Sequence, residues 1–339
     1  MISTGCTTIK TDNSYNDSVI QNNNSYNNQS LNKTFEKKII KKEPINVSYI
    51  FNDSNFELQT INLTLYKSYL DFYRSHPIDN TLPENGTFYT SFFKYNYSDH
   101  VYNDILEYTY NYSNNKKEQV EYLMHFISSI DYKIVDDFYY PYDFLYRGYG
   151  VCTEKSLLMA KLLSKLNYST SVIVFPKNNH LAVGLECTTP QYDKYCFIDV
   201  TDRFNYITDD TMKFNITNIS LEDDDYFIVN ISNGNIYNST KEYNLVNMLK
   251  NLTKENNKLI DKYNIYNDRL IKIENSSFED ICYNGGEYTV VYIKGLGKFY
   301  CNDLYEIYNN DVDKSNEIIA RGKDIEYVFK KYPFFDAYK

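Results

Sequence analysis

Three residues of this 339-residue chain have the types and the placement that thiol chemistry needs. Cys152 follows Gly148 and Gly150 and begins an apolar helical pattern, so its sulfur is expected at the first turn of a helix. Unpaired backbone N–H groups and the positive end of the helix dipole favour a thiolate there. The two glycines let the backbone approach a substrate closely. Cys152 is therefore a candidate nucleophile; the alternative is a cysteine buried as a small hydrophobic residue.

A thiolate nucleophile needs a base, and the chain has four histidines. His76, His100 and His125 are most simply surface residues or satisfied core residues. His180 differs, because it begins a strand-like segment directly after a Lys-Asn-Asn turn. A side chain at that position can point across toward another element, so His180 is the candidate base.

An acid that orients His180 is expected on the neighbouring strand. Asp199 lies within the apolar run FIDVTD, where a charged residue is costly unless it is paired. Asp199 is therefore the candidate acid, and Asp202 is the reserve candidate. The alternative for Asp199 is a carboxylate at a strand edge that faces solvent.

The elements that must position these residues follow from hydrophobic periodicity. A helix is predicted from Cys152 to about Leu166, followed by three antiparallel strand candidates at 169–175, 180–187 and 195–202. Upstream, helices are predicted over 64–76, over 99–112 with Asp99 as N-cap, and over 116–130, with a strand over 88–95. This order predicts an α+β fold.

The C-terminal part has a different pattern. From Leu245 to Ile273, apolar residues recur at spacings of three and four, which predicts a long amphipathic helix. We expect this helix to lie on the core; a dimerising coiled coil is the alternative. Beyond it, Cys282 and Cys301 flank EYTVVYIKGLGKFY, which predicts a strand, a glycine-containing turn and a second strand.

Composition and pattern together predict four regions. The first is rich in Asn, Ser and Thr with few large aliphatic residues, so it is expected to be a disordered tether. The regions are the tether at 1–45, a helical N-terminal segment at 46–113, the core that carries the candidate triad at 114–205, and a C-terminal region with the long helix and the hairpin at 206–339.

The overall composition argues against several classes of protein. The net charge of −10 and the pI near 5.0 disfavour a nucleic-acid partner, which needs clustered lysine and arginine. No run approaches the roughly 18 apolar residues of a membrane span. No metal or organic cofactor is expected, because neither a CxxC nor a His-x-His pattern occurs.

Two features predict an extracellular location. The chain has 17 Asn-x-Ser/Thr sequons, whereas random placement would give about six. In addition, MISTGCTT resembles the end of a lipoprotein signal peptide, so that Cys6 would be lipidated and the protein tethered to the cell surface. The alternative for this segment is a plain disordered start.

The remaining cysteines fit an oxidising compartment. Cys282 and Cys301 are expected to bridge the ends of their hairpin. Cys187 is separated from His180, and Cys196 from Asp199, by an odd number of positions along its strand. Side chains at odd separations point to opposite faces of a sheet, so both sulfurs would face away from the triad. A regular ladder with Cys187 opposite Cys196 would set His180 about four residues beyond Asp199, so either a bulge intervenes or one inference fails. We give the triad precedence over this disulfide.

In the order Cys, His, Asp, the three candidates resemble the transglutaminase-like superfamily of papain-like thiol enzymes over residues 114–205. In that family, a Pro-x-acid-x-Leu segment leads into Gly-x-Cys at a helix start. The matching residues are Pro141, Asp143, Leu145, Gly150 and Cys152.

Further positions support the resemblance. Acidic and small helix positions of the family match Glu154 and Ser156, and its Asp-x-Thr motif matches Asp199 and Thr201. The upstream LYKSYLDFYRSHP is similar to archaeal surface proteins that carry this domain. The chain departs from the family at Val151, where Asp or Asn is common, and after His180, where many members have an aromatic residue. These departures bear on acceptor specificity.

The resemblance implies a papain/transglutaminase-like core, with the nucleophile helix packed on an antiparallel sheet. It also implies that Cys152 attacks an amide carbonyl to form a thioester, with His180 as base and then acid and Asp199 fixing its tautomer. The backbone N–H of Cys152 is the expected first oxyanion donor.

The leading functional hypothesis is an extracellular thiol enzyme that cleaves or transfers amide or isopeptide bonds of proteins or cell-wall peptides. A peptidase resembling the pseudomurein endoisopeptidases and a true crosslinker both fit. The alternative is a non-catalytic surface adhesin on a transglutaminase-like scaffold. A third possibility is an internal or adhesive thioester formed by the thiol.

Overall fold

The computed structural model describes residues 43–79, 86–134, 137–201, 206–208, 211–214, 217–220 and 226–332. Cys6, Asp202 and most of the expected tether lie outside the described residues. The chain divides into two compact units, Met1–Tyr243 and Asn244–Lys339. The described residues form both helices and sheets, in agreement with the expected α+β class.

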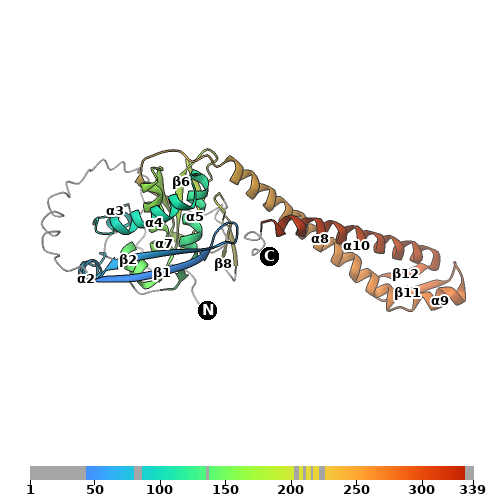
Figure 1. Ribbon diagram of the computed structural model, residues 1–339. Helices are drawn as coiled ribbons and strands as arrows, with labels where there is room; N and C mark the ends of the chain where they lie inside the picture. Colours follow the sequence, from blue (N-terminus) through green and yellow to red (C-terminus); the bar gives the residue numbers. More distant parts are fainter. Residues whose placement is uncertain are drawn as a thin grey trace. The chain divides into compact units, whose positions relative to one another are not determined.

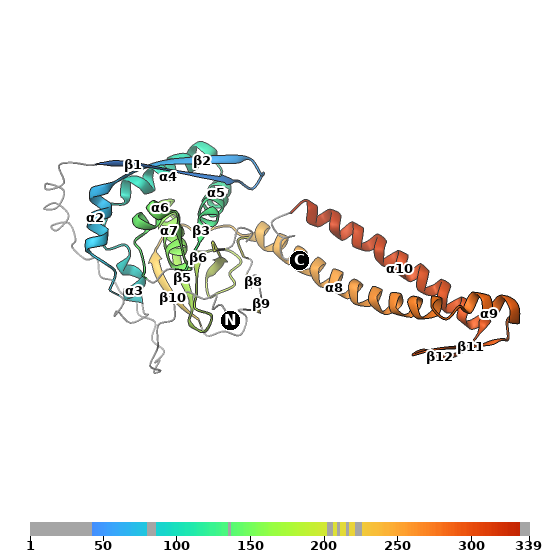
Figure 2. The ribbon, with the colours of Figure 1, turned by 90° about the horizontal axis from the view of Figure 1, so that it is seen from below.

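A helix packed on a four-stranded sheet forms the centre of the first unit (Figure 2). The helix is α7 (Cys152–Lys165), and every residue from its start to Ala160 is buried. The sheet has the order β10-β5-β6-β7, and all neighbouring pairs are antiparallel. Its strands are β5 (Thr170–Phe175), β6 (His180–Glu186), β7 (Tyr195–Ile198) and β10 (Phe227–Ser232). The C-terminal region predicted from residue 206 therefore contributes an edge strand to this sheet.

Three further helices surround α7. The predicted helices at 99–112 and 116–130 are present as α4 (Asp99–Tyr112) and α5 (Lys116–Ser129), although Ser98 rather than Asp99 is the N-cap of α4. The third helix, α6 (Pro141–Arg147), lies directly before β4 and α7 in the chain. Pro141 fits the first position of α6, because the backbone N–H that proline lacks would have no partner within the helix there. At the other end, Gly148 terminates the helix with a φ of 70°.

The N-terminal region is not purely helical as predicted. It begins with the antiparallel hairpin β1 (Pro44–Asn52) and β2 (Leu58–Tyr66), and only then continues into α2 (Lys67–Ser75). In β2, Ile61, Leu63 and Leu65 are buried and alternate with polar residues, which is the pattern of a strand with one face on a core. Aromatic side chains of β1 pack on α5, as Phe51 does on Tyr122 with ring centroids 5.2 Å apart.

The strand predicted over residues 88–95 is wrong. Residues 88–91 belong to helix α3 (Gly86–Ser91). In this conformation the side chains of Phe88, Tyr89 and the following Phe92 are all buried. Aromatic residues favour strands in general, but this preference is weak and is overridden by packing. Here tertiary contacts decide the local conformation.

The register of β6 and β7 resolves the conflict between the triad and the disulfide. Leu185 pairs with Cys196 and Val183 with Ile198, so Cys187 lies diagonally to Cys196 and not directly opposite. The disulfide between them nevertheless forms, with Cα atoms 5.7 Å apart. Diagonal neighbours lie close enough for such a bridge. The assumption of a directly opposed pair was therefore the error. The observed register accommodates the disulfide and the strand positions of His180 and Asp199 without a bulge in the paired residues.

Gly150 has a role in packing that the sequence did not show. A Cβ on this residue would lie 2.7 Å from the ring of Phe144, which is closer than carbon atoms can approach. Packing against Phe144 of α6 thus requires a glycine at this position. This contact explains Gly150 by packing and does not bear on the expected close approach of a substrate.

Several short elements complete the first unit. They lie in loops between the larger elements and in the segment before β10. Strand β3 (Asp131–Tyr132) pairs in parallel with β4 (Tyr149–Gly150), and β8 (Thr211–Phe214) pairs with β9 (Thr217–Ser220). A 3-10 turn, η1 (Pro176–Asn178), joins β5 to β6.

The second unit is a helical hairpin with a small disulfide-bonded tip (Figure 1). The predicted long helix is α8 (Thr240–Glu274), and the predicted strand-turn-strand is β11 (Val290–Ile293) with β12 (Gly297–Tyr300). The remaining helices are α9 (Phe278–Gly285) and α10 (Cys301–Lys330). The expected Cys282–Cys301 disulfide is present.

Within the second unit, helix α8 pairs with α10. Ion pairs from Arg269 to Asp311 and from Arg321 to Glu255 join the two helices in antiparallel orientation. The sequence analysis did not predict α10. Its buried positions include the polar Asp311 and Ser315, which interrupt the apolar pattern that would reveal a helix.

The two ion pairs of this hairpin predict unequal effects on stability. Arg269→Gln is expected to lower the free energy of unfolding by about 3 kcal/mol, because Asp311 has a fully buried side chain and would lose its counter-charge. Arg321→Gln removes a pair whose side chains are 47% and 41% exposed, so a change below about 1 kcal/mol is expected. Urea unfolding followed by circular dichroism measures both. Equal losses in the two variants would contradict this assignment.

Candidate active site

Cys152 is the first residue of α7, as predicted. The N-terminus of this helix is held by Glu154, whose Oε2 accepts a hydrogen bond from the backbone N–H of Val151 at 3.1 Å. The other oxygen, Oε1, accepts from the backbone N–H of Tyr139 at 3.1 Å. One carboxylate therefore fixes both the first turn of α7 and the loop that leads into α6.

Glu154 is fully buried, and this burial raises its pKa to about 7. The backbone N–H groups of Tyr139 and Val151 act in the opposite direction, because they stabilise the charged form. The guanidinium of Arg147 also lowers the pKa, by a smaller amount. The side chain next to the candidate nucleophile can thus exchange a proton near neutral pH.

Contacts on both sides of His180 hold β6 against the start of α7. The Sγ of Cys152 lies 4.0 Å from the carbonyl oxygen of Asn179. The hydroxyl of Ser156, one turn further along the helix, donates a hydrogen bond of 2.9 Å to the carbonyl oxygen of Leu181. The structure therefore places Cys152 beside the strand end that carries the candidate base.

His180 and Asp199 form a pair at the same edge of the sheet. His180 is the first residue of β6, and Asp199 directly follows the last residue of the antiparallel neighbour β7. The Nε2 of His180 lies 3.2 Å from the Oδ2 of Asp199. The structure thus brings His180 and Asp199 together, and it places Cys152 next to Asn179, the residue before His180.

Thr201 orients the carboxylate of Asp199. Its backbone N–H and its hydroxyl both donate to Oδ1, at 2.8 Å and 2.5 Å, which leaves Oδ2 directed at His180. Burial by itself raises the pKa of Asp199, but the charge and hydrogen bond of His180 and the two bonds from Thr201 outweigh it. The net pKa of Asp199 lies below its ordinary value, so this residue remains ionised.

All three candidate residues are buried. Their exposed fractions are 0% for Cys152, 4% for His180 and 3% for Asp199. Cys152 is also disulfide-bonded in this structure. Thiol chemistry at this position therefore requires reduction of that bond and access of a substrate to the sulfur.

Comparison with known proteins supports the resemblance found in the sequence. Residues 88–198 match a family model described as a transglutaminase-like domain. The chain contains a transglutaminase-like domain. The match contains Cys152 and His180 and ends one residue before Asp199. Neither a curated protein nor a solved structure matches the chain.

The transglutaminase-like domain contains one further side chain at the site that sequence reasoning missed. Tyr132 lies on β3, which pairs in register with Gly150, two residues before Cys152. Partial burial raises the pKa of Tyr132 to about 12, and the negative charges of Asp199 and Glu154 add to this effect. No spacing in the sequence links Tyr132 to these residues, because only the β3–β4 pairing brings them together.

The other described histidines do not approach Cys152 in any contact that the structure shows. Nδ1 of His76 lies 2.9 Å from the backbone carbonyl oxygen of Phe72, and Nδ1 of His100 lies 3.0 Å from that of Tyr97. Burial lowers the pKa of His125 to about 4, so it is neutral at physiological pH. The choice of His180 as the base is therefore consistent with their positions.

Among the described residues, no group of three or more His, Cys, Asp or Glu side chains has the geometry to hold a metal ion. None of the helices in the described part of the chain is sufficiently long and apolar to span a membrane.

The raised pKa of Glu154 predicts a pH dependence of stability. Because the folded state binds this proton more tightly than the unfolded chain, the free energy of unfolding should fall as pH rises from about 4.5 to about 7. The contribution is on the order of 3 kcal/mol. In Glu154→Gln, which keeps the side-chain shape, this part of the decrease should vanish; urea unfolding at several pH values measures it.

A matched control separates this effect from general pH sensitivity. Glu317→Gln alters a carboxylate that is 68% exposed and should leave the pH profile unchanged. Some slope should remain in Glu154→Gln, since burial also raises the pKa of Glu121 to about 7. Profiles that are identical in Glu154→Gln and wild type would contradict the assignment.

Proposed function

We propose that the transglutaminase-like domain is a thiol enzyme that cleaves or transfers amide bonds through a thioester at Cys152. The observation that supports this proposal most directly is the His180–Asp199 pair, 3.2 Å apart, at the strand end beside the first turn of α7. A helix that begins with a cysteine and packs on an antiparallel sheet also fits the papain-like core that the sequence led us to expect.

The proposed reaction has two stages. The thiol of Cys152, once reduced, gives its proton to His180, and the sulfur attacks the carbonyl carbon of the amide. His180 then gives the proton to the leaving amine as the C–N bond breaks, which leaves an acyl thioester. Water or a second amine attacks this thioester, His180 takes the proton of the attacking group, and the thiolate of Cys152 leaves.

Each residue of the site has a defined role in this scheme. Nε2 of His180 faces Asp199, so proton exchange with the thiol falls to Nδ1. Asp199 is ionised and fixed by Thr201, so it holds the imidazole ring in place and stabilises the imidazolium. The backbone N–H of Cys152, at the start of α7, is the proposed first oxyanion donor.

Proteins or cell-wall peptides outside the cell are the proposed substrates. The excess of sequons supports an extracellular location. The disulfides Cys187–Cys196 and Cys282–Cys301 support it as well, because such bonds persist in oxidising compartments. A surface-tethered enzyme would meet such substrates at the cell envelope.

A second candidate function is supported by a specific observation. The burial of all three triad residues, together with the disulfide-bonded state of Cys152, is also what a non-catalytic scaffold would show. In that case the domain is a surface adhesin or binding module. The two functions differ in whether the reduced thiol is reactive.

The reactivity of Cys152 provides the test. After mild reduction, the alkylation rate of Cys152 is measured against pH by mass spectrometry of its peptide. We expect alkylation well below pH 8 in the wild type, because an adjacent imidazolium and the helix dipole stabilise the thiolate. His180→Ala should return the profile to that of an ordinary thiol, with a midpoint near 8.5, whereas His125→Ala should leave it unchanged.

Activity assays then identify the reaction. Ammonia release with amine incorporation indicates transfer, and new amino termini indicate peptide cleavage. We expect Cys152→Ala to abolish either activity, and His180→Ala to lower it by a factor of about 10² or more. A thiol that is unreactive, or indifferent to His180, would exclude the enzyme and favour the binding module.

A further inference from the structure

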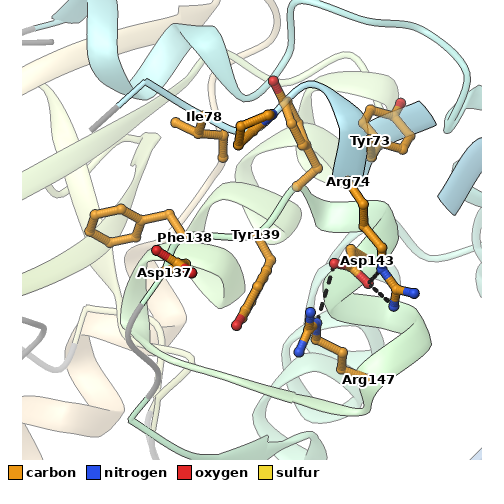
Figure 3. A pocket seen from close by; sticks show the side chains of 10 residues that line it. Tyr73, Arg74, Ile78, Asp137, Phe138, Tyr139, Asp143 and Arg147 are labelled. Carbon is orange, nitrogen blue, oxygen red and sulfur yellow. Dashed lines mark hydrogen bonds and ion pairs between the residues drawn. The ribbon is translucent and has the colours of Figure 1, made fainter. Parts of the chain in front are cut away.

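A second cavity of the first unit lies apart from the triad (Figure 3). It has a volume of about 250 Å³ and lies between the end of α2 and the start of α6. Neither the resemblance nor the proposed reaction gives it a role. The residues that line it are Tyr73, Arg74, Pro77, Ile78, Asp137, Phe138, Tyr139, Tyr140, Asp143 and Arg147.

Two arginines share one buried carboxylate at the wall of this cavity. Oδ1 of Asp143 accepts hydrogen bonds from Arg74, from Nη2 at 2.8 Å and from Nε at 3.2 Å. Oδ2 of Asp143 lies 3.2 Å from Nε of Arg147. Figure 3 shows the two guanidinium groups, one from α2 and one from α6, on either side of Asp143. The side chain of Asp143 is only 4% exposed, so this ion pair is built into the wall.

The three charges leave an excess of one positive charge. A guanidinium carries five N–H donors, and Asp143 engages only part of the ten that the two arginines provide. Arg147 is further held by Tyr139, whose ring centroid lies 3.7 Å from the guanidinium carbon. The guanidinium carbon of Arg74 lies 5.0 Å from the ring centroid of Tyr146. These contacts hold both arginines at the wall of the cavity, where their positive charge attracts an anion.

The other walls are apolar. Tyr73, Ile78 and Tyr140 are buried, and Phe138 and Tyr139 are half-buried. Asp137 lies at the exposed rim, where its negative charge opposes entry of a group with two negative charges. The volume suits a ligand of the size of a single amino acid.

We propose that this cavity binds a small carboxylate attached to an apolar group, the class to which the C-terminal residue of a peptide belongs. The planar forks of Arg74 and Arg147 match a planar carboxylate, and the aromatic walls accept its apolar part. A phosphate dianion fits less well, because the cluster of Arg74, Asp143 and Arg147 has a net charge of only +1 and Asp137 at the rim repels a second negative charge. The proposal goes beyond the thiol reaction and does not depend on it.

The absence of tryptophan from the chain allows a direct test. Phe138→Trp retains an aromatic wall and introduces a single fluorescent reporter at the cavity. Titration with N-acetyl-leucine should change the fluorescence in a saturable way. N-acetyl-leucinamide, which lacks the charge, should bind at least tenfold more weakly, and so should inorganic phosphate.

Substitutions in this reporter background identify the binding groups. Arg74→Gln and Arg147→Gln should each weaken binding of N-acetyl-leucine about tenfold or more, whereas Arg321→Gln, which removes the same charge from the second unit, should leave it unchanged. Arg74→Lys keeps the charge but loses the fork, so an intermediate affinity is expected. Circular dichroism melts establish that each variant is folded.

Three results would overturn the proposal. They are equal binding of N-acetyl-leucine and its amide, tighter binding of phosphate than of the carboxylate, and unchanged affinity in both folded arginine variants. If an arginine variant fails to fold, Ile78→Phe replaces it, because this substitution fills the cavity without touching the ion pair. Unchanged binding in folded Ile78→Phe would equally overturn the proposal.

Discussion

The packing of α7 against β6 is the constraint on which the site of this protein depends. Helix α7 is buried from Cys152 to Ala160, and the Ser156 hydroxyl bonds to the backbone of β6 directly after His180. A central helix surrounded by other elements cannot shift without opening the core, since protein interiors are close-packed. The position of the cysteine relative to the histidine is therefore set by the hydrophobic core of the whole unit.

A buried site of this kind must satisfy its charges internally. Glu154 accepts two backbone N–H groups, and Asp199 accepts two hydrogen bonds from Thr201 and faces His180. The outcomes differ because the partners differ. Glu154 has mainly neutral partners and a raised pKa, whereas Asp199 has an imidazole beside it and a lowered pKa. Two carboxylates of the candidate site thereby acquire different protonation behaviour.

The same loop serves both the site and the second cavity. Tyr139 donates its backbone N–H to Glu154 at the start of α7, while its ring packs on Arg147. Asp143, which the resemblance presented as a motif position, holds two arginines together at the wall of the cavity. Residues of one sequence motif thus support two different features of the fold.

The amino-acid sequence by itself determined the central elements and the three candidate residues. Helix α7, the strands β5 to β7 and helix α8 have strong local patterns. His180 stood out because it begins a strand directly after a turn, and Asp199 because a charged residue in an apolar strand is costly unless it is paired. The tertiary structure decided what depends on distant partners. Helix α3 formed in place of a predicted strand, α10 was hidden by the buried Asp311 that Arg269 neutralises, and the diagonal disulfide followed from the register of β6 and β7. Local sequence patterns record which face of an element is apolar, but they contain no information on the element that will cover it.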